Sequence, residues 1–170
     1  MKILSPLHAE SLVSWLADTA SACLIDEARL SPKPGLVDSR GSGAHQDLTL
    51  ALMERSARSL QPTFHALAQQ SWRRPADIAL RETVGRLGRE GEAQMMQATG
   101  GVNTHRGAIW ALGLLVSAVA MLGGEGQSQT IADTAAALAR LDAQMLAHNA
   151  SPGGAADLLA ATLFLDRVAG

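Results

Sequence analysis

Apolar residues recur every three or four positions along most of this chain, which is the spacing of helices that bury one face. In residues 8–29 the buried face would carry Leu12, Leu16, Ala20 and Leu24. The same periodicity predicts further helices over residues 48–60, 62–70, 78–98, 107–122, 129–148 and 152–168. No stretch alternates apolar and polar residues as a half-buried strand would. The pattern therefore predicts an all-α fold, a single-domain helical bundle with polar site loops between its helices.

Prolines, glycines and short polar side chains indicate where these helices begin and end. Pro32 cannot continue the first helix. Gly100 and Gly101 indicate the end of the helix over residues 78–98. The expected N-caps are Asp47 for the second helix, Asn103 or Thr104 for the fifth, and Ser151, followed by Pro152, for the last.

Three glycines, Gly85, Gly88 and Gly91, recur at a spacing of three inside the fourth predicted helix. Each glycine costs a helix interior about 1 kcal/mol relative to alanine. The repeated spacing therefore indicates that another backbone or a ligand approaches this face of the helix closely.

The composition of the 170-residue chain fits one folded domain. The chain is 47% hydrophobic and 18% charged with a net charge of −2, which argues against disorder and against a broad nucleic-acid surface. Its one cysteine, Cys23, cannot form an internal disulfide, so a reducing compartment is the simpler expectation. The most apolar run, residues 108–122, is shorter than the roughly 20 residues of a membrane span. We therefore expect a cytoplasmic protein with no membrane and no nucleic-acid partner.

Polar residues gather at three breaks between the predicted helices, over residues 31–47, 100–107 and 149–157. Most connections between elements are roughly two to six residues long, and a loop as long as the first break is usually functional or disordered. We interpret the first break as functional because it combines basic residues, carboxylates, a histidine and glycines.

The first break holds candidate ligands for an anion and for a divalent cation. Basic side chains pair with phosphate oxygens, and glycines let backbone N–H groups approach an anion. The candidate anion-binding residues are Lys33, Arg40, Gly41, Ser42 and Gly43. The candidate cation-binding residues are Asp38, His45 and Asp47. The alternative is a capped turn, in which Asp47 caps the next helix while Asp38 and His45 satisfy the loop.

The other two breaks offer a helix N-terminus and a further carboxylate. A helix N-terminus carries about half a positive charge and free N–H groups, and so suits an anion. The residues at this start are Asn103, Thr104, His105 and Arg106, and the alternative is an ordinary capped start with an exposed arginine. Asp157 in the third break is either a solvated group or a metal or catalytic group facing the other loops. Together the breaks indicate a Mg²⁺-dependent enzyme acting on a phosphorylated small molecule.

Three long motifs resemble the triphosphoribosyl-dephospho-CoA synthase family. They are LSPKPGLVDSRGSGAHQDL, GGVNTHRGAIWALGLL and NASPGGAADLLAATLFLD, in the family's order, and their wording is closest to the malonate decarboxylase branch. The resemblance implies an all-α enzyme in which the ribose 2′-hydroxyl of 3′-dephospho-CoA displaces adenine from C1′ of ATP. The product, 2′-(5″-triphosphoribosyl)-3′-dephospho-CoA, is the precursor of the prosthetic group of the decarboxylase acyl carrier protein.

The resemblance also implies roles for the polar residues. A carboxylate would stabilise the oxocarbenium-like transition state, and a base would activate the attacking hydroxyl. The candidate catalytic residues are Asp38, Asp47 and Asp157, and the candidate Mg²⁺ ligands are Asp38, Asp47 and Glu90. Lys33, Arg106 and Mg²⁺ would hold the triphosphate. The candidate substrate-binding residues are Lys33, Gly41, Ser42, Gly43, His45, Asn103, Thr104, His105, Arg106, Ser151, Gly153 and Gly154.

One departure from the family concerns the interval before the third motif. Members of the family carry further helical sequence there, whereas only residues 123–150 span it here, so we expect an internal deletion. The alternative to an enzyme is a degenerate, non-catalytic module that binds ATP, dephospho-CoA or the acyl carrier protein. A shortened core would also leave apolar helix faces exposed, which favours a homo-oligomer.

Overall fold

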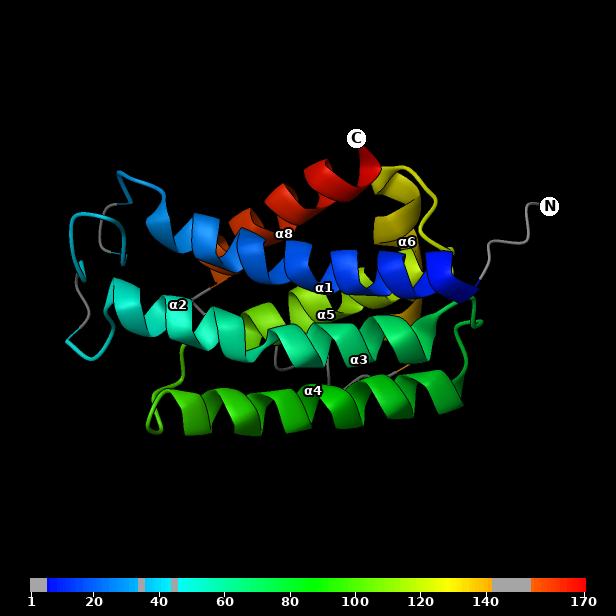
Figure 1. Ribbon diagram of the computed structural model, residues 1–170, viewed down its shortest axis with the longest axis horizontal. Coiled ribbons are helices and arrows are strands. Elements are labelled where there is room, and N and C mark those ends of the chain that lie inside the picture. Colours follow the sequence, from blue (N-terminus) through cyan, green and yellow to red (C-terminus); the bar gives the residue numbers. More distant parts are fainter. Residues whose placement is uncertain (1–5, 34–35, 44–45, 142–153) are drawn as a thin grey trace.

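The structure is a computed structural model, and it describes residues 6–33, 36–43, 46–141 and 154–170 (Figure 1). Its helices are α1 (Pro6–Arg29), α2 (Leu50–Ser59), α3 (Gln61–Ser71), α4 (Ile78–Ala98), α5 (Arg106–Met121), α6 (Ser128–Ala139) and α8 (Gly154–Ala169). The described residues contain no sheet, only an isolated bridge between Asp38 and Gly41. The predicted all-α fold is therefore confirmed.

Helix α5 runs through the middle of the bundle because apolar side chains cover its whole circumference. Every residue from 112 to 120 is buried, and the helix contacts α1, α3, α4, α6 and α8. Around it, α2 and α3 lie nearly in line between α1 and α4 (Figure 1). Helix α8 packs on both α1 and α5, and Asp157 in its first turn lies against Gly107 of α5. No helix in the described part of the chain combines the length and apolar character that crossing a bilayer requires.

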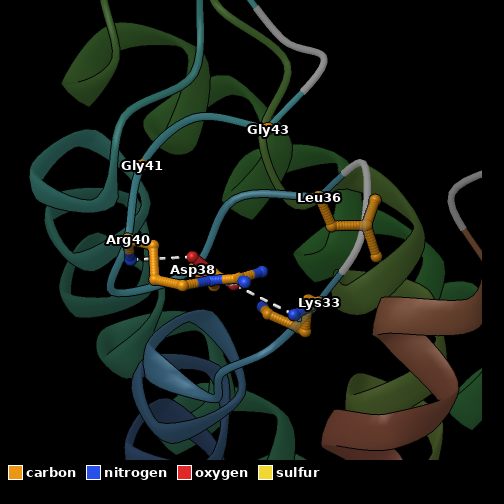
Figure 2. A pocket seen from close by; sticks show the side chains of 6 residues that line it. All are labelled: Lys33, Leu36, Asp38, Arg40, Gly41 and Gly43. Carbon is orange, nitrogen blue, oxygen red and sulfur yellow. Dashed lines mark hydrogen bonds and ion pairs between the residues drawn. The ribbon is translucent and has the colours of Figure 1, made fainter.

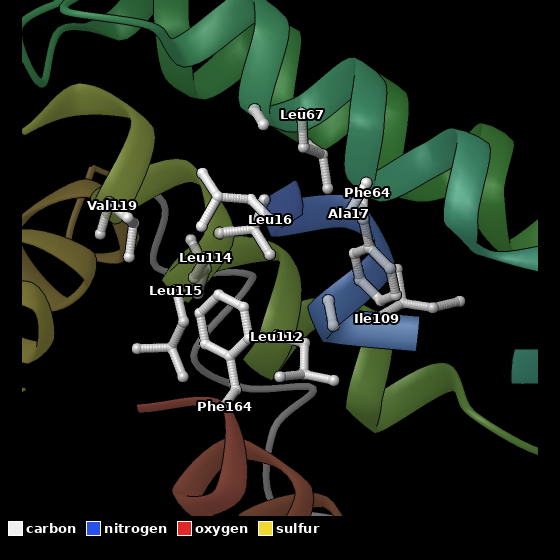
Figure 3. Packing of buried hydrophobic residues seen from close by; sticks show 14 of the residues in the cluster. Leu16, Ala17, Phe64, Leu67, Ile109, Leu112, Leu114, Leu115, Val119 and Phe164 are labelled. Carbon is white, nitrogen blue, oxygen red and sulfur yellow. The ribbon is translucent and has the colours of Figure 1, made fainter. Parts of the chain in front are cut away.

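The core joins helices that are far apart in the sequence. Leu16 of α1, Phe64 of α3 and Phe164 of α8 are fully buried and gather around α5 (Figure 3). Removing one such side chain from water contributes roughly 1.5–3 kcal/mol. Burial of Phe164 therefore holds α8 against α5, and this packing fixes where the first turn of α8 lies.

The glycines of α4 lie where side chains of neighbouring helices approach closely. A Cβ atom on Gly88 would lie 2.8 Å from two ring carbons of Trp110 in α5. A Cβ atom on Gly91 would lie 2.5 Å from Cγ2 of Thr63 in α3. Both distances are shorter than ordinary contacts, so glycine lets α4 pack this tightly. The expected close approach is therefore to protein side chains of α3 and α5.

The glycine signals around the second break are confirmed, whereas the predicted N-cap of the fifth helix, Asn103 or Thr104, is wrong because His105 occupies that position. Gly100 and Gly101 follow α4 with φ angles of +66° and +93°, which favour glycine. The Oδ1 atom of Asn103 accepts the N–H of Arg106 at 3.2 Å, although the residue directly before α5 is His105. Asn103 therefore satisfies one of the free N–H groups at the start of this helix.

The predicted N-cap of the second helix is wrong. Helix α2 begins at Leu50, and its cap is Thr49, whose Oγ1 atom accepts the N–H of Leu52 at 3.1 Å. A capping side chain reaches N–H groups two or three residues further along. Asp47 lies too early in the chain to reach the free N–H groups of α2, and its side chain is exposed.

The helix predicted over residues 129–148 is shorter than expected. Helix α6 ends at Ala139, and the N–H of Leu141 donates to the carbonyl of Leu138 in a tight turn. Such three-residue hydrogen bonds are typical of helix ends. Residues 142–153, with the predicted cap Ser151, lie outside the described residues.

Candidate active site

Asp38 organises the loop that follows α1. Its carboxylate accepts the N–H of Lys33 at 2.9 Å and the N–H of Arg40 at 2.7 Å. The Arg40 guanidinium also donates to it, from Nε at 3.0 Å. Arg40 and these N–H donors hold the pKa of Asp38 well below its usual range. A carboxylate that is so readily ionised is a weak base, so its contacts support the loop-satisfying alternative for Asp38.

A pocket of about 260 Å³ opens beside this loop (Figure 2). Its lining residues are Lys33, Leu36, Asp38, Arg40, Gly41 and Gly43. We expected the N–H of Gly41 to be available to an anion. Instead it donates to the carbonyl of Asp38 at 3.2 Å. The positive charges at the pocket are those of Lys33 and Arg40. The pocket therefore suits an anion through side chains more than through glycine N–H groups.

Lys33 is held at the pocket by Glu27 of α1. The Nζ atom of Lys33 donates to the Glu27 carbonyl and to Glu27 Oε1, each at 2.6 Å. Glu27 is only 3% exposed. A buried carboxylate costs free energy unless it is paired and hydrogen-bonded. The Lys33 ammonium satisfies Glu27 and is thereby fixed in one position.

Asp157 lies in the first turn of α8. Its Oδ2 atom packs against Gly107 of α5 so closely that no Cβ atom would fit there. Burial raises the pKa of Asp157 to about 6, with a smaller contribution from the negative charge of Glu27. Two contacts thus bring the three breaks toward one another: Lys33 pairs with Glu27 of α1, and Asp157 of α8 rests on Gly107 of α5. These four residues are called the cluster below.

Glu27 is a site residue that the sequence reasoning missed, although a signal existed. Glu27 falls on the apolar stripe of α1, in register with Leu16, Ala20 and Cys23. A carboxylate at such a position is rarely buried unless it has a partner. That spacing could have identified it as a buried charge, but not its partner.

His105 connects the start of α5 to α2. Its Nδ1 atom lies 2.7 Å from Ser56 Oγ, which also contacts Thr104 Oγ1 at 2.5 Å. Burial lowers the pKa of His105 to about 4, so the ring is neutral at physiological pH. These contacts give His105 and Thr104 a part in holding the helix start in place.

The carboxylates proposed as Mg²⁺ ligands do not come together. Glu90 is exposed and pairs with Arg86 of its own helix at 2.7 Å, whereas Glu92 pairs with Arg106 at 2.6 Å. Residues two apart on a helix point to different faces, and it is Glu92 that faces the second break. Among the described residues, no three His, Cys, Asp or Glu side chains form a group that could hold a metal. Within the described residues, Asp38, Asp47 and Glu90 therefore do not form such a group, and their role as metal ligands stays a prediction.

The model of the ATP:dephospho-CoA triphosphoribosyl transferase (CitG) family matches residues 13–137 and 126–170. The chain belongs to this family. The resemblance of the three motifs to the triphosphoribosyl-dephospho-CoA synthase family is thus confirmed. No solved structure matches the chain.

Curated relatives in this family carry the synthase name. A 2-(5″-triphosphoribosyl)-3′-dephosphocoenzyme-A synthase of Klebsiella pneumoniae is 94% identical over 141 residues, which cover 83% of this chain and 50% of the relative. A probable synthase of the same name from Stutzerimonas stutzeri is 57% identical over 157 residues, covering 91% and 53%. One from Azotobacter vinelandii is 59% identical over 146 residues, covering 84% and 50%. The chain spans about half the length of these relatives.

The structure places the predicted site residues in several different environments. Those in the cluster or at the pocket are Lys33, Asp38, Gly41, Gly43 and Asp157. Those that are exposed or half-buried elsewhere are Ser42, Asp47, Glu90, Asn103 and Arg106. Thr104 and His105 hold α5 to α2, and Gly154 begins α8. His45, Ser151 and Gly153 lie outside the described residues.

Proposed function

We propose that this chain is an ATP:3′-dephospho-CoA triphosphoribosyl transferase that releases adenine. The observation that carries the proposal is a pocket with two positive charges, where Glu27 of α1 holds the Lys33 ammonium in place. A buried carboxylate of raised pKa, Asp157, adds a candidate base. The wording of the three motifs supports the malonate decarboxylase branch. The product would then become the prosthetic group of the decarboxylase acyl carrier protein, in the cytoplasm.

Asp157 is the best candidate for the base. The 2′-oxygen of dephospho-CoA forms a bond to C1′ of ATP while the bond from C1′ to adenine breaks. The hydroxyl loses its proton to a carboxylate, and the departing adenine takes up one proton from water, so that protons and charge balance over the reaction. A base works best when its pKa is close to the working pH, and the pKa of Asp157 is raised to about 6. Its negative charge would also stabilise an oxocarbenium-like transition state.

Lys33 is the best candidate for holding the triphosphate. The triphosphate remains in the product, so it can serve as a handle that positions C1′ without taking part in bond cleavage. Lys33 and Arg40 provide the positive charge at the pocket, each paired with a carboxylate that phosphate oxygens would replace. Arg106 would add a guanidinium from the second break once it leaves Glu92.

Mg²⁺ would accompany the nucleotide, although the described carboxylates do not form a cage for it. Asp38 is surrounded by N–H donors and Arg40, and Glu90 pairs with Arg86. Mg²⁺ commonly binds through substrate phosphates with only one or two carboxylates. We therefore assign no step of the reaction to an ion held by Asp38, Asp47 or Glu90.

The second candidate is a non-catalytic module that binds ATP, dephospho-CoA or the acyl carrier protein. The observation that favours it is length, because the chain spans about half of its curated relatives. The family model aligns in two stretches that overlap at residues 126–137, which supports an internal deletion between about 123 and 150. Exposed apolar side chains such as Leu158, which is 67% exposed, support self-association, and sedimentation velocity would test it.

Adenine release separates the two candidates. The purified chain is incubated with ATP, Mg²⁺ and dephospho-CoA, and free adenine is measured by chromatography. We expect release from the natural chain and none from Asp157→Asn, with the circular dichroism spectrum unchanged. Asp133→Asn, which alters an exposed carboxylate of α6, serves as the matched control and should remain active. No adenine from the natural chain, with ATP binding retained, would favour the binding module.

A further inference from the structure

His105 is buried directly before α5, and one nitrogen of its ring has no partner. The Nδ1 atom lies 2.7 Å from Ser56 Oγ. The Nε2 atom is buried and makes no hydrogen bond to any residue that the structure describes. Most buried polar atoms in folded proteins are paired, because an unpaired one has lost its bonds to water without replacement. The Nε2 atom is therefore a candidate contact for a ligand.

A chain of hydroxyl groups decides which ring nitrogen of His105 carries the proton. The Thr104 hydroxyl lies 2.9 Å from Met95 Sδ, and since a thioether sulfur can only accept, Thr104 donates to it. Each hydroxyl has one hydrogen, so the 2.5 Å contact between Ser56 and Thr104 uses the hydrogen of Ser56. The contact between Ser56 and His105 then takes its hydrogen from Nδ1. Nδ1 is therefore protonated, and Nε2 keeps a free lone pair.

The reverse order of donors along this chain is less favourable for two reasons. It would leave Met95 Sδ without the hydrogen of Thr104. It would also put an unpaired N–H group at the buried Nε2 position, and among main-chain groups a buried N–H is left unpaired less often than a carbonyl. Burial lowers the pKa of His105 to about 4, so the ring is neutral at physiological pH. The ring therefore offers an acceptor at Nε2, and no donor.

His105 lies just below the surface of the second break. The next residue, Arg106, is exposed, and Gly107 is half-buried where Asp157 of α8 rests on it. Ala108, one residue further along α5, is fully buried. Burying a charged group beside this ring would cost free energy unless the charge were paired. A ligand that reaches Nε2 therefore needs an uncharged N–H or O–H donor on a largely apolar body.

Resting on the proposed function, we propose that His105 Nε2 accepts a hydrogen bond from the 6-amino group of an adenine base. Adenine is the flat, uncharged part of both ATP and dephospho-CoA, and its amino group is a donor. The ribose hydroxyls of ATP also donate, but they lie closer to its charged triphosphate. Because Nε2 gives up no hydrogen bond when the base arrives, the bond that it gains there is not offset on the protein side. His105 is thus a specificity-determining residue that transfers no proton.

The tautomer of His105 is tested by ¹⁵N NMR of the chain labelled in its histidine rings, at neutral pH. We expect Nδ1 at the shift of a protonated ring nitrogen and Nε2 at that of an unprotonated one. Ser56→Ala removes the acceptor of the Nδ1 proton, so the ring should then populate both tautomers. A protonated Nε2 in the natural chain would overturn the proposal. An Nε2 signal that neither nucleotide shifts would assign the atom to a structural water and overturn it as well.

Binding calorimetry on the natural chain tests the ligand with two matched pairs of nucleotides. The first pair is ATP and purine riboside 5′-triphosphate, which lacks only the amino group. The second pair is dephospho-CoA and its analogue with purine in place of adenine. We expect the natural nucleotide of one pair to bind about tenfold more tightly than its analogue. That pair identifies the adenine that His105 contacts, and equal binding within both pairs contradicts the proposal.

His105→Asn separates recognition of the base from support of the helix start. The asparagine amide nitrogen takes the place of Nδ1 and can still donate to Ser56, whereas no atom replaces Nε2. The natural nucleotide should bind about tenfold more weakly to this variant, and the analogue as tightly as before. A purely structural role would weaken both equally, which would refute the contact. His65→Asn, at a half-buried histidine of α3, is the matched control and should keep the preference.

The outcomes distinguish this inference from the proposed function. If adenine is released but neither natural nucleotide is preferred to its analogue, only the role of His105 fails. If the preference exists and disappears in His105→Asn but no adenine is released, only the transferase function fails. Circular dichroism verifies that His105→Asn is folded, and the NMR and calorimetry of the natural chain need no variant.

Discussion

Replacing Gly107 with alanine is the most selective way to displace Asp157 without changing any charge. Gly107 is in the first turn of α5, and Asp157 Oδ2 occupies the space that a Cβ atom would need. The neighbouring group is the far end of a short side chain and not backbone. The helix can therefore remain in place while the Asp157 carboxylate rotates away.

The expected change in stability is small because two effects oppose each other. Glycine to alanine in a helix gains up to about 1 kcal/mol. Forcing the Asp157 side chain away from its preferred rotamer costs about 0.5–1.5 kcal/mol. The free energy of unfolding should thus change by less than about 1 kcal/mol. Adenine release should fall by about 100-fold, since a displacement of about 1 Å at a reacting group can have that effect.

Urea denaturation and adenine release are measured on the same preparation. Gly85→Ala is the matched control, because a Cβ atom there would meet only the terminal Nη1 atom of Arg89 at 3.3 Å. It should gain stability and keep full activity. In a background of Asp157→Ala, Gly107→Ala should also gain stability, because the opposing group is gone. Normal activity of Gly107→Ala, or an equal loss of stability in both backgrounds, would refute this reasoning.

Three further predictions concern acid stability, packing and nucleotide binding. Because the pKa of His105 is lowered to about 4 in the folded state, the unfolded chain binds the proton more readily, and His105 should lower the free energy of unfolding as pH falls from 6.5 to 4. Because the pKa of Asp157 is raised to about 6, the folded state binds the proton more readily, and Asp157 should raise the free energy of unfolding as pH falls from 6 to 4. Each effect is below about 3 kcal/mol, and the two oppose each other between pH 4 and 6. On acidification over this range, the free energy of unfolding in urea should therefore rise relative to the natural chain in His105→Gln and fall relative to it in Asp157→Asn. Equal pH dependences in all three proteins would contradict both assignments. Gly91→Ala should destabilise the fold by about 1–3 kcal/mol, because the new Cβ atom would collide with the Thr63 side chain. Adding Thr63→Ala should restore most of the lost stability in thermal unfolding. If the losses of the two substitutions simply add, the contact is refuted. Lys33→Met should weaken ATP binding, measured by calorimetry, by about tenfold. Arg86→Met, which removes an arginine from an exposed ion pair of α4, should leave ATP binding unchanged. An equal loss of affinity in both variants would mean that only the net charge of the chain matters.

The helices themselves can be predicted from the sequence because burial imposes the period. The apolar residues that recur along one face of α1, and the continuous apolar run of α5, are the residues that the bundle buries. The glycines after α4 are equally informative, because their φ angles are a local property. Features that depend on one helix alone can therefore be predicted from the order of its residues.

The site depends on relations between helices, and these are harder to predict. Glu90 and Glu92 are equally acidic and two positions apart, and only the packing of α4 against α5 decides which one meets Arg106. The choice between Asp47 and Thr49 as a cap depends on where α2 begins. Glu27 escapes sequence reasoning because its partner, Lys33, belongs to the next loop, outside the helix whose period reveals the buried face. Periodicity indicates a buried face but does not identify what lies across from it.

We infer above all that the loop after α1 and the starts of α5 and α8 form one nucleotide site. The most direct test is a titration of the isotopically labelled chain with ATP, followed by NMR signals of Lys33 Nζ, the Arg106 guanidinium and the Asp157 carboxyl. If the three groups share one site, the three signals shift together and report one dissociation constant. Signals that shift at different ATP concentrations, or a response confined to one of the three, would contradict it.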